Sequence, residues 1–341
     1  MSGEDAVGLI EAYYAKGWTD GLPVIPPTEG TVGDMLAAGG YRGSEAIGEI
    51  PDRNAKVTAE KVAINAVLAG CRPEYMPVVA AAVQGLCHPD YHYHGPATST
   101  GGSCVVLIVN GPIGPKLDIN CRDNLFGPGW RANATIGRAV RLVMMNALNT
   151  RPGPSGLDRS TLGNPGKYTC CFAENEAESP WEPLHVERGF KRADSAVTVF
   201  AAEAHIQVYN QLSGDPEGLC MTMADAMANA GTSGIIGQAQ QAIVWAGEHA
   251  EIFRKAGWTR AQVKQTLFDY ARRTHEDLKR KGRMPGPLEP GDGMLWRHTV
   301  RTPDDLIVVH AGGKAGSFSA CLPGWGNKQA SRSVTIPIAT P

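Results

Sequence analysis

The chain lacks any apolar run that approaches the roughly 20 residues needed to cross a bilayer. It also lacks a basic start followed by a short apolar segment, and its opening, MSGEDAVGLIEAYYAKGW, is typical of an amphipathic helix. The net charge is only −2, and no basic run is interleaved with aromatic residues. These absences argue against a membrane span, a secretory signal and nucleic-acid binding. We therefore expect a cytoplasmic protein with no membrane or nucleic-acid partner.

Several local motifs are missing as well. None of the eight cysteines forms a CxxC pair, and a chain of 341 residues does not need disulfide cross-links to be stable. We expect most of the thiols to be reduced and buried. The adjacent Cys170 and Cys171 should point to opposite faces of a strand, so at most one of them can face a given site. Neither GxGxxG nor GxxxxGK[ST] occurs, so nucleotide binding has no direct support.

The hydrophobic pattern predicts an α/β fold. With 43% hydrophobic residues, the chain suits a globular protein with a substantial core. Runs of Val and Ile without polar alternation predict strands buried on both faces, at 104–110, 195–203, 241–246, 305–310 and 333–339. Apolar residues at helical spacing predict helices, at about 3–16, 57–70, 75–87, 132–149, 220–230, 248–256 and 260–281.

A weak internal repeat divides the chain. Residues 106–120 and 242–258 both give a strand, a glycine-containing turn and a helix, and residues 306–316 repeat the strand and the turn. We infer two related α/β units with mostly buried strands, joined by a polar segment rich in Pro and Gly. The predicted bounds are 1–150 for the first unit, 151–192 for the connecting segment and 193–341 for the second unit.

The turns that follow strands are the first candidates for a binding site. In an open α/β sheet such turns gather at one edge, where ligands bind. Asn110 and Gly111 lie in the turn after the strand 104–110. We therefore expect an active-site cleft between the two units, with these two residues among those that bind the substrate.

The stretch CHPDYHYHG, residues 87–95, holds three of the nine histidines. His92 and His94 share a face if residues 91–95 are extended. Two imidazoles and a third ligand could hold a zinc or iron ion. A metal-free acid/base site and a packing loop are the alternatives. We take His94, with His92 as its companion, as candidate catalytic or metal-binding residues.

Polar residues also gather where a helix is expected to begin. Arg131, Asn133 and Thr135 follow the turn GPGW and lie near the predicted helix N-terminus, where free N–H groups favour an anion. An arginine can hold a carboxylate through two hydrogen bonds. These residues are candidates for substrate binding, and the alternative is a capped helix with a solvated arginine.

The connecting segment contains the sequence ENEAESPWEPLHVERG. Glu174 and Glu176 end a likely strand, and Trp181 and His185 follow a proline turn. Two carboxylates and a histidine beside an aromatic ring are suitable for acid/base catalysis or metal binding. We predict that the glutamates are catalytic and that Trp181 and His185 bind the substrate. A simple linker is the alternative.

A thiol is the last candidate. Cys104 follows the small residues ATSTGGS at the start of a buried strand. It could be a nucleophile only if a histidine or a helix N-terminus stabilised its thiolate. Otherwise it is a core thiol.

Several phrases together resemble a known family. They are KGWTDGLPVIPPT, EKVAINAVLAGCRPEYMPVV, LIVNGP, GPGWRANATIGRA, ENEAESPWEPLHVERG and the closing AGG and LPGWGN. They are similar to an uncharacterised bacterial family loosely labelled thioredoxin-like and associated with UGSC-type (seleno)proteins of the glycine-reductase group. The resemblance implies a bacterial enzyme subunit. Gly101 stands where the UGSC motif has its reactive residue, and Phe318 stands where we expect relatives to show a histidine.

Together these observations predict an enzyme that acts on a small, carboxylated molecule. The expected reaction is of the lyase or hydrolase type and breaks a C–S, C–N or C–halogen bond, with assistance from a histidine or a metal ion. The alternatives are a thiol-based redox enzyme that uses Cys104 and a non-catalytic, ligand-binding partner subunit. We expect a homo-oligomer or a complex with a partner subunit.

Overall fold

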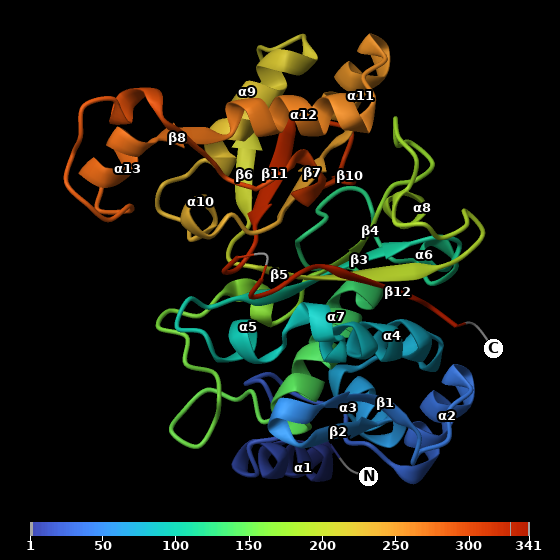
Figure 1. Cartoon of the computed structure of the whole chain (residues 1–341). Helices are drawn as coiled ribbons and strands as arrows, with labels where there is room; N and C mark the ends of the chain where they lie inside the picture. The colour runs from blue at the N-terminus through green and yellow to red at the C-terminus, as the bar shows by residue number, and fades with distance from the viewer. Residues whose placement is uncertain (1–2, 328, 340–341) are drawn as a thin grey trace.

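The computed structural model describes residues 3–327 and 329–339. Its centre is a pair of four-stranded mixed sheets that lie face to face (Figure 1). The first sheet has the order β12-β5-β3-β4. Its strands β3 and β4 are parallel, and the other neighbours are antiparallel. The bounds are β3 (Cys104–Asn110), β4 (Cys171–Ala173), β5 (Ala196–Ala202) and β12 (Val334–Pro337).

The second sheet has the order β10-β7-β11-β6. Here β10 and β7 are the parallel pair, and β11 is antiparallel to both β7 and β6. The bounds are β6 (Ile206–Tyr209), β7 (Gln241–Trp245), β10 (Leu306–His310) and β11 (Phe318–Pro323). The strands predicted at 104–110, 195–203, 241–246 and 305–310 are confirmed as β3, β5, β7 and β10, and each end agrees to within two residues.

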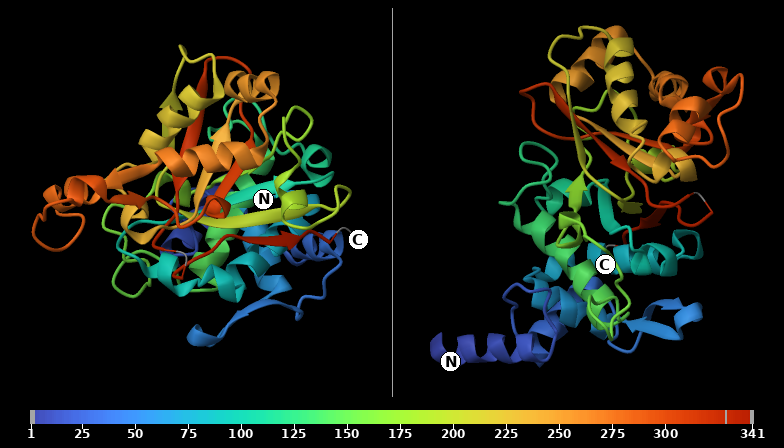
Figure 2. Two further views of the ribbon diagram at one scale, coloured as in Figure 1. Left: turned by 45° about the horizontal axis from the view of Figure 1, so that its top comes forward. Right: turned by 90° about the vertical axis from the view of Figure 1, so that its left-hand side faces the viewer.

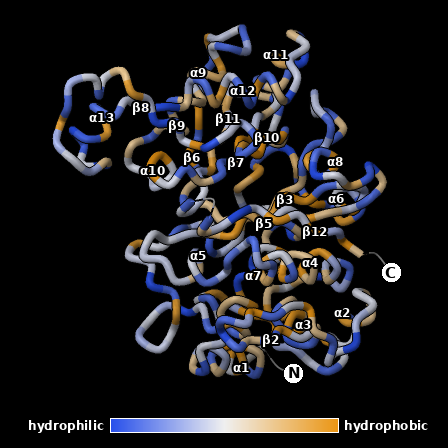
Figure 3. The backbone as a smooth tube through the Cα atoms, in the orientation of Figure 1, coloured by the Kyte–Doolittle hydropathy of each residue, from blue (hydrophilic) through white to orange (hydrophobic). Residues whose placement is uncertain are grey.

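Both faces of each central strand are buried, because a sheet covers one face and helices cover the other. In β3, Val106 and Ile108 pack in a core shared by the two sheets. Leu107 and Val109 point the other way, into a core shared with helices. This alternation at a period of two explains why the strands read as unbroken apolar runs. Figure 3 shows these runs as hydrophobic segments in β3 and β5.

Helices form the two outer layers, so that the molecule has four layers in the order helix, sheet, sheet, helix. The first sheet is covered by α3 (Ala59–Ala69), α4 (Met76–Cys87) and α7 (Arg131–Asn146). The second is covered by α9 (Pro216–Met227), α11 (Gly247–Ala256) and α12 (Arg260–Tyr270). The α/β class is therefore confirmed.

The remaining elements lie outside these layers or connect them. At the N-terminal end are α1 (Gly3–Ala15), α2 (Glu29–Gly39) and the hairpin of β1 (Ala46–Ile50) and β2 (Ala55–Thr58). Short helices between the strands are α5 (His94–Thr98), α6 (Ile113–Lys116), α8 (Leu184–Glu187) and α10 (Gly234–Gly237). An arm projects from the second sheet (Figures 1 and 2) and consists of β8 (Arg272–Thr274), α13 (His275–Arg280) and β9 (Trp296–His298).

The two sheets repeat one topology. The order α4-α5-β3-α6-α7-β4-α8-β5 in the first unit matches α9-α10-β7-α11-α12-β10-β11 in the second, except that α8 lies between β4 and β5 and the arm is inserted after α12. In each unit the first strand is parallel to the second and antiparallel to the third. The next strand of each unit crosses over, so that β6 joins the second sheet and β12 joins the first. The two units are therefore related and exchange one strand.

This exchange means that the sheets do not follow the predicted unit bounds. The strands β5 and β12 both lie within the predicted second unit, 193–341, yet they belong to the first sheet. The physical reason is backbone pairing, because β5 binds β3 along all seven residues from Cys104 to Asn110. Among residues 3–327 and 329–339, no helix has the length and apolar character that a membrane crossing requires.

Candidate functional site

The carboxyl ends of the parallel strands β3 and β4 carry a group of buried polar residues. The pairing of the strands places Asn110 beside Glu174, whose backbone N–H donates to the Val109 carbonyl over 3.0 Å. The Asn110 amide nitrogen donates to both carboxylates, at 2.6 Å from Glu174 Oε2 and 3.0 Å from Glu176 Oε1. We call Asn110, Glu174, Glu176, His185 and Arg260 the carboxylate cluster.

The turn after β3 is shaped by a glycine. Gly111 has a φ of +86°, and a Cβ atom at this position would lie 2.1 Å from the Asp194 carbonyl oxygen. Only glycine fits such a conformation and such a close approach. The turn directs the Gly111 N–H to Glu176 Oε1, 2.6 Å away. The prediction that the Asn110–Gly111 turn lies at the end of a buried strand is confirmed.

Glu174 is the buried member of the two carboxylates. Burial raises its pKa to about 7, and the charge of Glu176 acts in the same direction. Arg260, the Leu184 N–H and the Asn110 amide oppose this shift without cancelling it. The Leu184 N–H lies 2.8 Å from Glu174 Oε2. Near neutral pH, Glu174 therefore holds a proton in a substantial fraction of the molecules.

His185 adds an unpaired imidazole to the cluster. The short helix α8 places it in the interior with no exposed surface. Neither ring nitrogen has a hydrogen-bond partner among the described residues. Its Nδ1 lies 3.8 Å from Glu176 Oε1. Burying an imidazole whose nitrogens lack hydrogen-bond partners costs free energy of folding, so such a residue calls for a functional explanation. An imidazole beside a carboxylate can accept or release a proton.

Arg260, at the start of α12, closes the cluster from the side of the second unit. It contacts Glu174 at 3.5 Å, Glu187 at 2.9 Å and the carbonyl oxygen of Glu182. Its guanidinium also lies 5.9 Å from the ring of Trp181. The same Glu187 carboxylate binds Lys264. The buried positive charges are thus matched by carboxylates, as the interior of a protein requires.

A cavity of about 790 Å³ opens onto this cluster. It is bounded by residues 176–192 on one side and by the turn between α11 and α12 on the other. Glu176 is partly exposed, at 22% of its side-chain surface, whereas the Glu174 side chain is fully buried. The wall includes Trp181, Glu182, Arg254, Trp258 and Arg260. Of Glu174 and Glu176, therefore, Glu176 is the one that a ligand in the cavity can contact.

Five residues predicted from two separate stretches thus meet at one place: Asn110, Gly111, Glu174, Glu176 and His185. Trp181 lines the adjoining cavity. The residue that sequence reasoning missed is Arg260. Its stretch, TRAQVKQ, reads as the start of an exposed amphipathic helix, and nothing local indicates that the guanidinium is buried.

The two histidines of the opening stretch do not join this site. Residues 89–91 form a tight 3₁₀ turn and α5 begins at His94, so 91–95 is not extended as the shared face required. His92 is exposed, and His94 Nδ1 accepts a hydrogen bond of 3.2 Å from Arg53 Nε. Among the described residues, no group of three or more His, Cys, Asp and Glu side chains could hold a metal ion. Metal binding by His92 and His94 stays a prediction.

The polar residues at the start of α7 bond within the fold. Arg131 donates twice to the Gly70 carbonyl, at 3.0 and 3.1 Å. Thr135 Oγ1 donates to the Arg131 carbonyl. Asn133 and the backbone of Asn120 exchange two hydrogen bonds of 2.8 and 3.0 Å. These side chains fix loops onto α7 and do not face the cavity at the carboxylate cluster.

We expect Asn133→Ala to lower the free energy of unfolding by about 2 kcal/mol, because it leaves the buried N–H of Asn120 unpaired and removes one of the two hydrogen bonds that the Asn120 carbonyl accepts. Chemical denaturation measures the change. Thr135→Val is the control, since that hydroxyl only adds a bond to a carbonyl of its own helix. Equal, small effects of both substitutions would contradict the structural role of Asn133.

Cys104 does not meet the condition set for a nucleophile. It is buried in the core between the sheets, and burial raises the pKa of its thiol to about 12. A thiol with such a pKa carries almost no thiolate at neutral pH. The alternative stated for Cys104, a core thiol, fits its surroundings.

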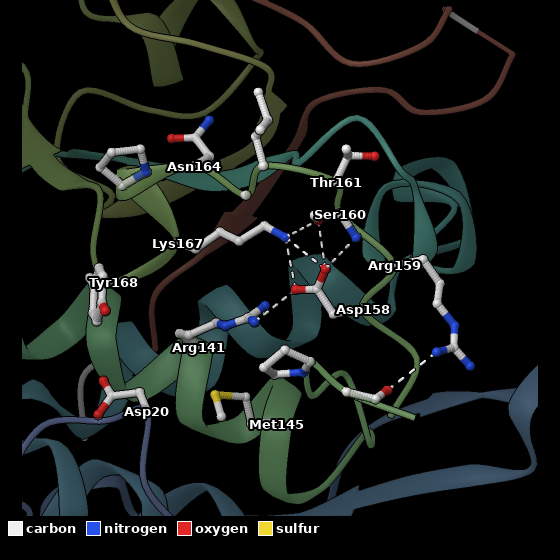
Figure 4. Close-up of a pocket in the computed structure, with 15 residues that line it drawn as sticks. Asp20, Arg141, Met145, Asp158, Arg159, Ser160, Thr161, Asn164, Lys167 and Tyr168 are labelled. Atoms are coloured by element: carbon white, nitrogen blue, oxygen red, sulfur yellow. Dashed lines mark hydrogen bonds and ion pairs between the residues drawn. The ribbon is translucent and has the colours of Figure 1, made fainter. Parts of the chain in front are cut away.

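A second cavity, of about 680 Å³, contains a buried ion cluster (Figure 4). Asp158 binds Lys167 at 2.7 Å and Arg141 at 2.9 Å. Burial alone would raise the pKa of Asp158, but hydrogen bonds from Lys167, Ser160 and Arg141 hold it well below its ordinary value. Lys167 directs its three N–H donors at Asp158 and Ser160. Because these groups satisfy one another, we interpret the cluster as a tether of the connecting segment to α7.

The carboxylate cluster thus combines a cavity, a carboxyl group with a raised pKa and an unpaired imidazole. These features mark a site of proton transfer better than any other group of predicted residues. No family model, curated protein or solved structure matches the chain, and the functional argument therefore depends on this geometry.

Proposed function

We propose that the protein is an enzyme that uses the carboxylate cluster for acid/base chemistry on a small, carboxylated molecule. The reaction is of the lyase or hydrolase type and breaks a C–S, C–N or C–halogen bond. One observation carries the proposal: Glu174 and Glu176 share the Asn110 amide, the buried His185 lies beside Glu176 with no hydrogen-bond partner among the described residues, and Glu176 lines a cavity.

Glu176 is the group proposed to touch the substrate. Its partial exposure lets it take a proton from a carbon or a water molecule in the cavity. Asn110 and the Gly111 N–H hold its Oε1 in place. Glu174, which holds a proton in a substantial fraction of the molecules, shares the Asn110 amide with Glu176, and His185 Nδ1 lies 3.8 Å from Glu176 Oε1. Glu174 and His185 are therefore positioning residues in this proposal.

Arginines in the cavity support a carboxylate as part of the substrate. Arg254 lines the cavity and is partly exposed, with 43% of its side-chain surface open to solvent. The Nε of Arg260 has no hydrogen-bond partner among the described residues. A guanidinium binds a carboxylate through two parallel hydrogen bonds. Arg254 is the candidate anchor, in place of the Arg131 expected from the sequence.

The test is turnover of a panel of small carboxylic acids that carry a C–S, C–N or C–halogen bond next to the acid, followed by mass spectrometry of the products. For a substrate found in this way, Glu176→Gln should lower kcat about 100-fold, because it removes the proton acceptor and keeps the shape. Glu182→Gln is the matched control, since Glu182 lines the same cavity and faces solvent. Unchanged turnover in Glu176→Gln would overturn the proposal.

A further inference from the structure

A third cavity, of about 650 Å³, lies at the opposite end of β4 from the carboxylate cluster. Cys170 and His205 both line it, and Cys170 Sγ lies 3.1 Å from His205 Nε2. Cys170 immediately precedes β4, and His205 lies in the crossover between β5 and β6. The exchange of strands between the two units thus brings a histidine to the start of β4.

The strand geometry selects Cys170 over its neighbour. Cys170 packs with the core between the sheets, whereas Cys171 packs with the core under the helices. Both residues border the cavity, but only Cys170 lies on the side of β4 that packs against the second sheet, next to His205. Gly166 makes room above the pair, because a Cβ atom there would lie 3.0 Å from His205 Cε1.

The loop that carries Gly166 is fixed to the crossover. Asn164 Nδ2 donates to the Glu203 carbonyl over 2.8 Å, and Asn164 Oδ1 accepts from the Gly166 N–H over 2.8 Å. The side chain of Glu203 in turn binds Ser233. These hydrogen bonds hold the backbone beside His205 in a defined conformation, which keeps His205 Nε2 close to Cys170 Sγ.

The walls of the cavity suit an acyl group. Leu125, Phe126 and Pro128 form an apolar side, and the ring of Phe126 packs edge-on against His205 at 5.2 Å. The first turn of α7 contributes Asn133 and Ala134. The N-cap residue Trp130 makes no side-chain capping hydrogen bond to this helix in the part of the chain that the structure describes. Backbone N–H groups at an uncapped helix start can stabilise negative charge that develops on a carbonyl oxygen.

The pair rests in its neutral form. Burial raises the pKa of Cys170 well above its ordinary value, and nearby thiols add to the shift. Burial also lowers the pKa of His205. At neutral pH the thiol keeps its proton and the imidazole has none, so His205 is free to accept the proton when the sulfur reacts.

We propose that Cys170 and His205 form a second reactive site that accepts a small, apolar acyl group from an ester or thioester. The Cys170 Sγ–acyl bond forms as the bond between the acyl carbon and the leaving oxygen or sulfur breaks. The thiol proton passes to His205 Nε2 and then to the leaving group. Water, deprotonated by His205, attacks the acyl carbon, the Cys170 Sγ–acyl bond breaks, and His205 returns the proton to the sulfur as the carboxylic acid leaves. This site is independent of the one proposed at the carboxylate cluster.

The probe is p-nitrophenyl acetate, and the readouts are nitrophenolate release and peptide mass spectrometry. We expect one acetyl group on Cys170. We expect no acetylation at this position in Cys170→Ala and about 100-fold slower acetylation in His205→Gln. Cys171→Ala is the matched control and should react like the unmodified protein. Acetyl groups found only on other residues, or an undiminished rate in a folded His205→Gln, would overturn the proposal.

The unmodified protein provides a test that does not depend on the folding of a variant. Because burial lowers the pKa of His205 below the ordinary value of about 6.5, an acetylation rate that depends on neutral His205 is level from about pH 6.5 upward and declines only at lower pH, where His205 is protonated. A free thiol would instead react about tenfold faster for each pH unit up to its own pKa. That steady rise would show that Cys170 acts without His205, and the proposal would be wrong.

Discussion

Replacing Arg260 by methionine is expected to lower the free energy of unfolding by about 3–5 kcal/mol. The Arg260 side chain is 9% exposed and contacts Glu174, Glu187 and the Glu182 carbonyl. Methionine fills much of the same space without the charge. Among the described residues, it leaves Glu174 without a cationic contact and Glu187 with one cation, Lys264. Removing one partner of a buried ion pair lowers the free energy of unfolding by more than the intact pair contributes, because the remaining charge is buried without a counter-charge. Urea denaturation measures the loss.

Arg192→Met is the matched control for this experiment. Arg192 also binds a glutamate of the same segment, Glu182 at 2.7 Å, but its side chain is 62% exposed. Water solvates both partners of such a pair, so its removal should cost less than about 1 kcal/mol. Equal losses in the two variants would mean that Arg260 is not held in the interior as described.

The contrast between Arg260 and the predicted residues shows what the sequence could establish. Glu174, Glu176 and His185 stand in a polar stretch that packing does not explain, and Asn110 ends a buried strand. Those are local signals, and parallel pairing of β3 and β4 then brings the residues together. Arg260 lies in a helix that looks solvent-exposed, and only the packing of α12 against residues 174–187 makes it part of the cluster. Contacts of that kind have no local pattern.

Prediction of the secondary structure was also limited where an element depends on contacts with distant parts of the chain. The long Val/Ile runs were recognisable, but the short strands β4, β6 and β11 were missed, since three to six residues of mixed character are stabilised by their neighbours. The helix predicted over 260–281 is interrupted at β8, which pairs with β9. Helical spacing continues through this break, and the pairing partner lies more than twenty residues further along the chain.

The extended backbone assumed for the histidine stretch is not formed, for a local reason that the sequence did contain. Pro89 favours a turn, and the structure shows the turn running on to Tyr91, with His92 in the left-handed region at a φ of +50°. Two residues of extended chain, which would have aligned His92 with His94, are not formed. The spacing of ligands along a sequence is informative only where the backbone between them is regular.

Unfolding measured across the neutral range should show that Glu174 destabilises the native protein as the pH rises. Its pKa is raised from the ordinary value of 4.5 to about 7 in the folded state. Between these two values the native state binds more protons than the unfolded state, so stability decreases with increasing pH. A shift of this size corresponds to about 3 kcal/mol, present in full below about pH 4.5 and lost above about pH 7.

Glu174→Gln removes this titration and keeps an oxygen to accept hydrogen bonds from Asn110 and the Leu184 N–H. Any fixed cost of the substitution is the same at every pH. We therefore expect the stability of the variant, relative to the unmodified protein, to be about 2.5 kcal/mol more favourable near pH 8 than near pH 5. Glu182→Gln, at an exposed position, should show no such change. If Glu174→Gln also shows none, Glu174 is ionised throughout this range and cannot hold the proton that the acid/base proposal assigns to it.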